Sequence, residues 1–400
     1  MFSLKSPLVR FAPWLIVGTF AVVAIGVGVA SDIGAVNGRL GGDFPSFYAA
    51  GRIVLDGNGS QLYDPAFQQT AQSDLLVDGQ FLYFAYPPYT AVVYSSLAWM
   101  PFGLAFGIHT ALALAALVGA LVAIRPLVRG YLDGWGRLGI ALVACLMSYP
   151  VLRSVMGGQN ATFTLLGFAL VARFDDDDRP FATGSVAACL LYKPQFGLLV
   201  LALLLVGRRW RAIMWSIPVA VFLFGIGAVV TGGFWITTWL EAVADFGAEN
   251  LDVNGPLMIS AWGWFQNVMG PGGAATWIAM AVVLATAIPF AVATATRRWT
   301  SIPWYAAAPV ILVAAPSALY YDATLTAVTV ITTLAWARGL HWLAISSIVA
   351  VTWLQAPAMA IGWSPLFIPI LATAAAFALA AFRPPGMRAI RPPPLDAGHP

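Results

Sequence analysis

The sequence predicts an all-α polytopic membrane protein, for three reasons. First, hydrophobic residues make up 60% and charged residues 9% of the 400 residues, and the mean hydropathy is +0.82. A water-soluble chain could not bury so much apolar surface. Second, apolar runs long enough to cross a hydrocarbon layer of about 30 Å recur from Phe11 to Phe382. Third, these runs do not alternate as strands do, so we expect helices, which satisfy their own backbone hydrogen bonds in lipid.

We expect about twelve crossings in one transmembrane domain, 1–383, followed by a Pro-rich basic cytoplasmic tail at 384–400. Both termini are predicted to be cytoplasmic, because short joints rich in Lys and Arg favour that side. These joints contain Lys5 and Arg10; Arg125, Arg129 and Arg137; Arg173 and Arg179; Arg208, Arg209 and Arg211; Arg297 and Arg298; Arg338; and Arg383, Arg388 and Arg391. The expected crossings lie at roughly 11 to 31, 103 to 124, 138 to 152, 160 to 173, 181 to 192, 196 to 207, 212 to 231, 274 to 296, 301 to 315, 323 to 337, 342 to 361 and 364 to 382.

Parts of this topology have alternatives. The first run is longer than the apolar region of a secretory signal and lacks a strong cleavage site, so we expect a retained helix. In the twelve-crossing version, Pro88 to Met100 is a juxtamembrane or re-entrant helix. Alternatively it crosses, Arg125 to Arg137 lies outside, and 181 to 207 is one kinked helix.

Two large loops are predicted outside the cytoplasm, at about 31–87 and 231–273. The first contains two helix-like pieces, Phe44 to Leu55 and Pro65 to Val77, joined by a turn at Asp56 to Gly59. It is therefore predicted to be helical. Loops of this size in an otherwise economical chain usually carry function.

Four cations lie outside the cationic joints and are candidates for function, because the topology rule gives no other reason for them: Arg39, Arg52, Arg153 and Lys193. Lys193 lies within an apolar run, where exposure to lipid would cost at least about 2.5 kcal/mol. It is expected to face a polar cavity, unless it snorkels to the interface.

Asp43 lies shortly after the first apolar run and directly before a short aromatic helix that begins at Phe44. As a helix N-cap, Asp would be ordinary at this position. A carboxylate near a helix start is also held ionised and can accept a proton from a sugar hydroxyl. The two roles do not exclude each other.

Other polar residues have a functional and a structural interpretation. Gln159 and Asn160 either hold sugar hydroxyls or cap a helix, and Asp322 either contacts an acceptor or a metal, or is a solvated loop acid. The acidic run Asp175 to Asp178 is expected to be a solvated joint. A second acidic set is expected to form one exposed helical face: Glu241, Asp245, Glu249 and Asp252.

Several of these residues belong to sequence pieces that resemble glycosyltransferase family 87 from about residue 40 to 325. In order, the pieces are Gly42-Asp43-Phe44, Phe47-Tyr48-Ala49-Ala50-Gly51, Leu62-Tyr63-Asp64-Pro65, Tyr86-Pro87-Pro88, Gly158-Gln159-Asn160, Lys193-Pro194, Gln266-Asn267, and Pro316-Ser317 before Tyr320-Tyr321-Asp322. That family contains polyprenyl-phosphate-mannose-dependent mannosyltransferases with the GT-C membrane fold. The chain departs from the family in lacking the His often found in the stretch Ala315 to Tyr321, and in reversing the commoner Asn-Gln order at Gln266-Asn267.

The resemblance implies a GT-C-type bundle and an inverting transfer of a sugar, with mannose favoured, from a polyprenyl-phosphate donor to a lipid or glycan acceptor. It places the active site at the inner or plasma membrane, facing the periplasm or cell exterior, and implies Asp43 as the general base. Lys193 and Arg153, followed by Arg52, are the candidates for the donor phosphate. The other candidates for substrate binding are Tyr48, Tyr63, Tyr86, Gln159, Asn160, Gln266, Asn267, Ser317, Tyr321 and Asp322.

We expect no cofactor and no metal ion, although a divalent cation is compatible with the pattern, and no nucleic-acid partner. Phosphate-cradling Gly-rich loops and zinc-site spacings are missing from the sequence. The main alternative function is a multi-span lipid or solute transporter or flippase, since many broken helices are also a carrier pattern. A third is an O-antigen ligase-like or polymerase-like enzyme. The long first loop and the lack of an internal repeat argue against a carrier.

Overall fold

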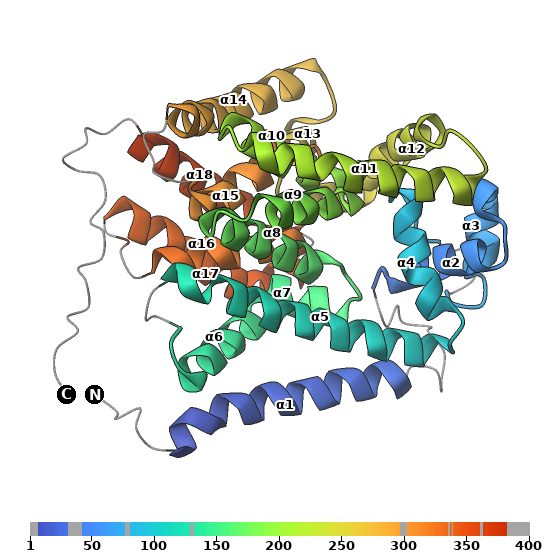
Figure 1. The fold of residues 1–400 in the computed structure, drawn as a ribbon, viewed down its shortest axis with the longest axis horizontal. Coiled ribbons are helices and arrows are strands. Elements are labelled where there is room, and N and C mark those ends of the chain that lie inside the picture. The colour runs from blue at the N-terminus through green and yellow to red at the C-terminus, as the bar shows by residue number, and fades with distance from the viewer. Residues whose placement is uncertain are drawn as a thin grey trace.

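The computed structural model describes residues 7–30, 42–76, 81–128, 132–296, 302–334, 337, 339–360 and 363–381, and these residues form helices and turns without strands. The helices are α1 (Pro7–Ala30), α2 (Phe44–Leu55), α3 (Pro65–Gln72), α4 (Pro88–Ala98), α5 (Phe102–Ile124), α6 (Trp135–Met147), α7 (Tyr149–Met156), α8 (Ala161–Asp176), α9 (Pro180–Cys189), α10 (Pro194–Val206), α11 (Trp210–Thr231), α12 (Ile236–Asn254), α13 (Ala261–Met269), α14 (Gly273–Ala295), α15 (Trp304–Ala314), α16 (Thr326–Thr333), α17 (Leu340–Ala360) and α18 (Phe367–Ala381) (Figure 1). Short 3-10 helices lie at η2 (Gly59–Gln61), η3 (Arg125–Val128), η4 (Leu190–Tyr192), η5 (Gly255–Leu257) and η6 (Tyr320–Leu325). The all-α prediction is confirmed for the described part of the chain.

Each expected crossing falls on one helix or on two consecutive ones, but most of these helices are short. Within the described residues, four helices are long and apolar enough to span a membrane: Phe102–Val128, Trp210–Thr231, Gly273–Ala295 and Leu340–Ala358. Helices α6 and α7, bent by 82°, make a fifth if the pair is one broken span. The chain therefore has the helices of a membrane protein, whereas the number twelve stays a prediction.

Helices α9 and α10 are two helices and not one kinked helix, as the alternative for 181 to 207 required. A Cβ placed on Gly197 would lie only 2.6 Å from the carbonyl carbon of Leu190. These residues are seven positions apart, so in a continuous helix they would be separated by about 10 Å along the axis. The chain therefore turns back at Lys193, where Pro194 cannot continue the preceding hydrogen-bond pattern.

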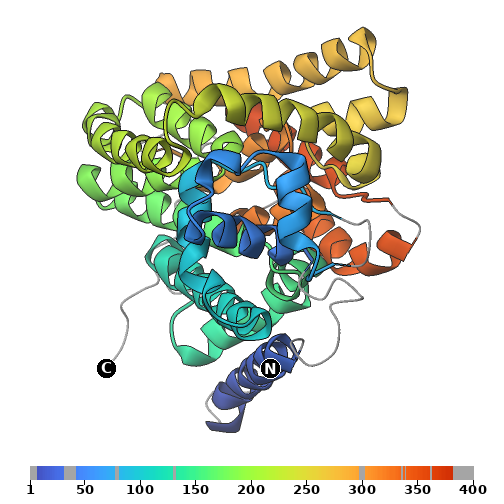
Figure 2. The same ribbon diagram turned by 90° about the vertical axis from the view of Figure 1, so that its right-hand side faces the viewer.

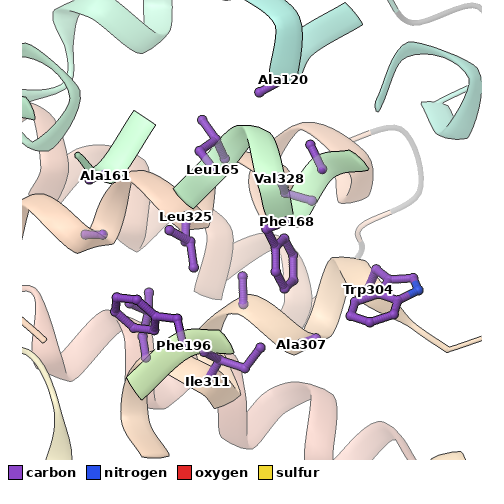
Figure 3. Packing of buried hydrophobic residues seen from close by; sticks show 14 of the residues in the cluster. Ala120, Ala161, Leu165, Phe168, Phe196, Trp304, Ala307, Ile311, Leu325 and Val328 are labelled. Carbon is purple, nitrogen blue, oxygen red and sulfur yellow. The ribbon is translucent and has the colours of Figure 1, made fainter. Parts of the chain in front are cut away.

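The largest hydrophobic core lies where α5, α8, α15 and α16 meet. Figure 3 shows Phe168 of α8 beside Val328 of α16, above Ala307 and Ile311 of α15. The indole of Trp304 packs edge-on against Phe168, with ring centroids 5.7 Å apart. This core fixes the positions of the turns that precede α8 and α16.

The first loop forms a second, separate hydrophobic cluster together with α4 and the start of α5. Helix α2 has the predicted bounds, whereas α3 ends at Gln72 and the predicted end at Val77 lies outside the described residues. Helices α2 and α4 are in close contact, since a Cβ on Gly51 would lie 2.7 Å from the Tyr94 backbone. Figure 1 shows α2, α3 and α4 grouped at one end of the molecule, and Figure 2 shows the same helices, in blue and cyan, facing the viewer. The first loop is thus a packed helical unit.

The second loop packs onto the first. In α12, the Trp239 indole nitrogen donates to the Ala85 carbonyl at 3.0 Å, and the Phe246 ring lies 5.9 Å from that of Tyr83. The acidic face of α12 is exposed, as predicted, at Glu241, Asp245, Glu249 and Asp252.

The acidic run Asp175 to Asp178, at the end of α8, is a solvated joint only in part: Asp176 and Asp178 are exposed as expected, but Asp175 is not. Asp175 is buried and accepts a hydrogen bond from Arg209 Nε at 2.6 Å and one from Trp304 Nε1 at 2.9 Å. It thereby joins the end of α8 to the starts of α11 and α15. Arg39 and the predicted tail at 384–400 lie outside the described residues.

Candidate functional site

Asp43 is held against the turn that follows α7. Its backbone N–H donates to the Gly157 carbonyl at 3.1 Å. The preceding Gly42 has φ +51°, and a Cβ there would collide with the same carbonyl oxygen, so the approach requires glycine. Asp43 occupies the N-cap position of α2, but its side chain makes no capping hydrogen bond. The capping interpretation therefore does not account for its carboxylate.

The Asp43 carboxylate lies among residues from three other segments. It interacts electrostatically with Arg153 of α7 and with Tyr86, Tyr320 and Tyr321. Burial raises the pKa of the Tyr321 hydroxyl well above its usual value, and the negative charges of Asp43 and then Asp322 raise it further. These phenols are consequently neutral hydrogen-bond donors at neutral pH.

Arg153 is fixed by two tyrosines. Its Nε donates to the Tyr320 hydroxyl at 3.3 Å. The Tyr320 ring stacks on that of Tyr149, with centroids 5.7 Å apart. Because Tyr149 and Arg153 are one helical turn apart in α7, this stacking aligns the guanidinium with the turn that contains Tyr320.

Lys193 lies at the turn between η4 and α10 and is 2% exposed, so it does not snorkel. Its Nζ lies 2.5 Å from Asp322 Oδ1 and donates to Asn160 Oδ1 at 3.3 Å. The ammonium also lies over the rings of Phe196 and Tyr321, 5.2 and 5.4 Å from their centroids. A buried charge persists only when it is paired and hydrogen-bonded, and these contacts meet that requirement.

Asp322 is buried as well, which contradicts the interpretation as a solvated loop acid. Its second oxygen, Oδ2, accepts the Leu319 N–H at 3.0 Å and so closes the turn at the start of η6. This turn is tied to the second loop, because the Ile259 N–H donates to the Ala318 carbonyl at 2.8 Å. Both large loops therefore reach the same site.

Tyr86 and the two amides complete the group. Burial raises the pKa of the Tyr86 hydroxyl, Asp322 and Asp43 raise it further, and the side chain of Asn160 lies next to this hydroxyl. The Asn160 carbonyl accepts from the Tyr192 hydroxyl at 2.9 Å. Gln159 Oε1 is buried and has no hydrogen-bond partner among the described residues. Such an acceptor costs about 1 to 3 kcal/mol if left unpaired, which suits a ligand contact.

We call the assembled residues the polar cluster: Asp43, Tyr86, Arg153, Gln159, Asn160, Lys193, Tyr320, Tyr321 and Asp322. Its four charged members are two carboxylates and two cations, so their formal charges cancel. It can therefore accept a proton, donate hydrogen bonds and stabilise an added anion. Within the described residues, no group of three or more His, Cys, Asp or Glu side chains could hold a metal ion.

The other predicted site residues have different positions. Tyr48 donates to the Met100 carbonyl at 2.8 Å, and Arg52 forms a salt bridge with Asp74 at 2.8 Å. Tyr63 donates to the Tyr86 carbonyl at 2.8 Å and so holds the backbone of Tyr86, a member of the polar cluster.

Three more lie on or beside the second loop. Ser317 Oγ accepts from Asn250 Nδ2 at 3.4 Å. Gln266 and Asn267 are half-buried on α13, and Asn267 Oδ1 lies beside Gly255. Their proposed contacts with substrate stay predictions.

Sequence reasoning missed Tyr149, Tyr192 and Tyr320 as parts of the site. Tyr320 was visible only as the neighbour of Tyr321. Tyr149 stands directly before Pro150, and Tyr192 stands directly before Lys193. Neither tyrosine belongs to a sequence motif that indicates a site.

A family model described as Glycosyltransferase family 87 matches residues 84–301, slightly more than half of the chain. Comparisons with curated proteins and with solved structures give no match.

Proposed function

The chain belongs to glycosyltransferase family 87. On that premise we propose that it is an inverting membrane enzyme that moves a hexose from a polyprenyl-phosphate donor to an acceptor outside the cytoplasm. Mannose is the first sugar that we propose. The family assignment supports a membrane glycosyltransferase with a sugar donor, an acceptor and membrane lipids as its partners. The observation that most supports the finer proposal is the placement of Asp43 in one polar cluster with Lys193 and Arg153. The matched segment does not include Asp43, so its role is argued from its contact with Gly157, which lies inside that segment.

In the proposed reaction, Asp43 is the general base. The acceptor hydroxyl oxygen attacks the anomeric carbon of the donor sugar while the hydroxyl proton passes to the Asp43 carboxylate. The bond between the anomeric carbon and the phosphate oxygen breaks, the configuration inverts, and polyprenyl phosphate leaves with the bonding electron pair. Neutral Tyr86 and Tyr321 hydroxyls are suited to orient sugar hydroxyls near this carboxylate.

The leaving phosphate gains negative charge, and fixed cations in a water-poor site stabilise such charge. Lys193 is our first candidate and Arg153 the second. An ammonium has three donor hydrogens, and Asp322 and Asn160 accept two of those on Lys193. In this proposal Asp322 is a positioning residue that holds the Lys193 ammonium in place, and the third hydrogen serves the phosphate.

We further propose a GT-C-type bundle of about twelve crossings, with the polar cluster facing the periplasm or exterior of the inner or plasma membrane. The coincidence of every expected crossing with helical segments supports this arrangement. So does the contact between the two large loops, which the charge pattern predicts on the same side.

The proposal is tested with purified protein in phosphatidylcholine nanodiscs and radiolabelled polyprenyl-phosphate mannose, followed by other polyprenyl-phosphate sugars, with a membrane lipid and glycan extract as acceptor. We expect transfer with inversion that persists in EDTA, because Lys193 and Arg153 supply the positive charge. Transfer from a nucleotide sugar alone, or movement of substrate across the bilayer of proteoliposomes without transfer, would overturn the proposal.

A further inference from the structure

A groove runs along the inner face of α6 and ends beside the polar cluster. It has a volume of about 640 Å³ and is lined by α6, the start of α7, η6, α16 and α17. Arg137 lies at one end, while Ser148 and Val151 line the end nearest α7. Among the described residues, none of its lining comes from α9, η4 or α10.

The groove has the shape and surface of a site for a hydrocarbon chain. Its walls are mainly small and apolar, as at Ala144 and Ala327, and its rim is exposed at Ile140 of α6 and Trp353 of α17. From Arg137 to Ser148, α6 rises roughly 17 Å, a little over half of a hydrocarbon layer of about 30 Å. One chain of a lipid whose headgroup lies at the polar cluster would fit this length.

The inner end of the groove is lined by residues that neighbour the polar cluster in sequence. Ser148 and Val151 flank Tyr149, whose ring stacks on Tyr320. On the facing side, Thr324 lines the groove two residues after Asp322, and its buried hydroxyl has no hydrogen-bond partner among the described residues. An unpaired hydroxyl at this junction suits the polar end of a lipid.

The position of the groove favours the acceptor over the donor as its occupant. The donor phosphate is assigned first to Lys193, at the turn before α10, from which the groove takes no lining residue; Arg153, the second candidate, lies on α7. Asp43 instead docks on the turn after α7 and interacts with Arg153 of that helix. The acceptor hydroxyl must lie at Asp43, and α7 also lines the groove.

We propose that this groove, between α6, α16 and α17, holds the hydrocarbon chain of the acceptor, so that the acceptor is a membrane lipid and not a free glycan. This inference rests on the proposed function, with Asp43 as the base and Lys193 at the phosphate. It adds the class of acceptor, a membrane lipid, which the position of the groove near Asp43 supports.

A kinetic test uses Ala144→Phe to fill the groove, with Ala327→Phe as a second filling variant. The matched control is Ala115→Phe, an exposed alanine of α5 outside the groove. Two acceptors with the same sugar, dodecyl mannoside and methyl mannoside, are compared in phosphatidylcholine nanodiscs. We expect wild type to prefer the dodecyl acceptor, and both filling variants to raise its KM at least tenfold with the KM for the donor unchanged.

A binding test needs no turnover. Dodecyl mannoside and undecaprenyl phosphate, each with a diazirine in its chain, are crosslinked to the protein and the labelled peptides are identified. We expect the mannoside to label Ile140 to Ser148, the filling variants to lose this labelling, and the control to keep it. Undecaprenyl phosphate should label other peptides.

The outcomes separate the two proposals. Wild-type protein without any sugar transfer contradicts the proposed function, whichever peptides are labelled. Transfer with a raised donor KM in the filling variants, or undecaprenyl phosphate in the groove, would assign the groove to the donor and overturn this inference. Equal use of methyl and dodecyl mannoside would overturn it as well.

Discussion

Replacing Asp43 by Asn should remove most sugar transfer and leave the fold in place. The Asp43 side chain makes no capping hydrogen bond, so the substitution does not remove a cap worth about 0.5 to 2 kcal/mol. The backbone hydrogen bond to Gly157 at 3.1 Å does not depend on the side chain. Loss of a general base lowers turnover by about two to four orders of magnitude, equivalent to roughly 3 to 5 kcal/mol in the activation barrier.

Asp64 provides the matched control, because it is an N-cap in the same loop. Its carboxylate accepts the Phe67 N–H at 3.0 Å at the start of α3. Asp64→Ala should therefore lower the free energy of unfolding by about 0.5 to 2 kcal/mol and keep turnover per folded molecule. Asp43→Asn should instead keep the free energy of unfolding and lose turnover per folded molecule.

The assay measures initial rates of transfer from polyprenyl-phosphate mannose in nanodiscs, alongside thermal unfolding of each variant. Near wild-type turnover in Asp43→Asn would refute the assignment and leave Asp43 a structural residue of the α2 start. Equal loss of transfer in Asp64→Ala at full folding would show that the loop, and not the carboxylate, is what matters.

Three further predictions concern charge. Lys193→Met should abolish transfer and destabilise the protein by about 3 to 5 kcal/mol, because it leaves Asp322 buried without its cation. Adding Asp322→Asn to this variant should restore thermal stability but not transfer. Recovery of transfer in the double variant would contradict the role of the ammonium. In intact cells and a background without Cys145 and Cys189, cysteine at position 58 should react with an impermeant maleimide and cysteine at 176 should not, and the opposite result would reverse the orientation. Asp175→Ala should lower the unfolding temperature while turnover per folded molecule stays unchanged, since its Arg and Trp partners join helices far from the base; a selective loss of kcat would contradict a purely structural role.

Local sequence patterns predicted the elements well. The bounds of α2 followed from the aromatic spacing after Asp43 and the Asp56 to Gly59 turn, and Gly57 indeed adopts φ +77° there. At 181 to 207 the sequence left two crossings and one kinked helix as alternatives, and the structure shows two helices that meet at Lys193. These features depend on neighbours in sequence, which periodicity and turn residues report.

Long-range pairings were not predictable in the same way. Asp322 and Lys193 are 129 positions apart, as are Asp175 and Trp304, and in each case the partner decides whether the carboxylate is buried. Asp175 opens a run of four aspartates and Asp322 was expected in a loop, and exposure is the ordinary outcome for an acidic residue in either setting. Family motifs named the site residues as candidates, and their roles stay predictions; their mutual contacts required the structure.

The separation of the two hydrophobic clusters has a consequence for biogenesis. Apart from Ala242, the buried residues of the first-loop cluster lie between Phe44 and Phe106. This unit can therefore collapse around Asp43 early in translation. Asp322, which anchors Lys193, follows Asp43 by 279 residues (322 − 43), a delay of roughly 14 to 56 s at ribosomal rates of about 5 to 20 residues per second. During that interval the nascent chain carries Asp43, the proposed base, without the carboxylate that holds Lys193, so we expect it to be inert toward donor lipids already in the membrane until insertion is nearly complete.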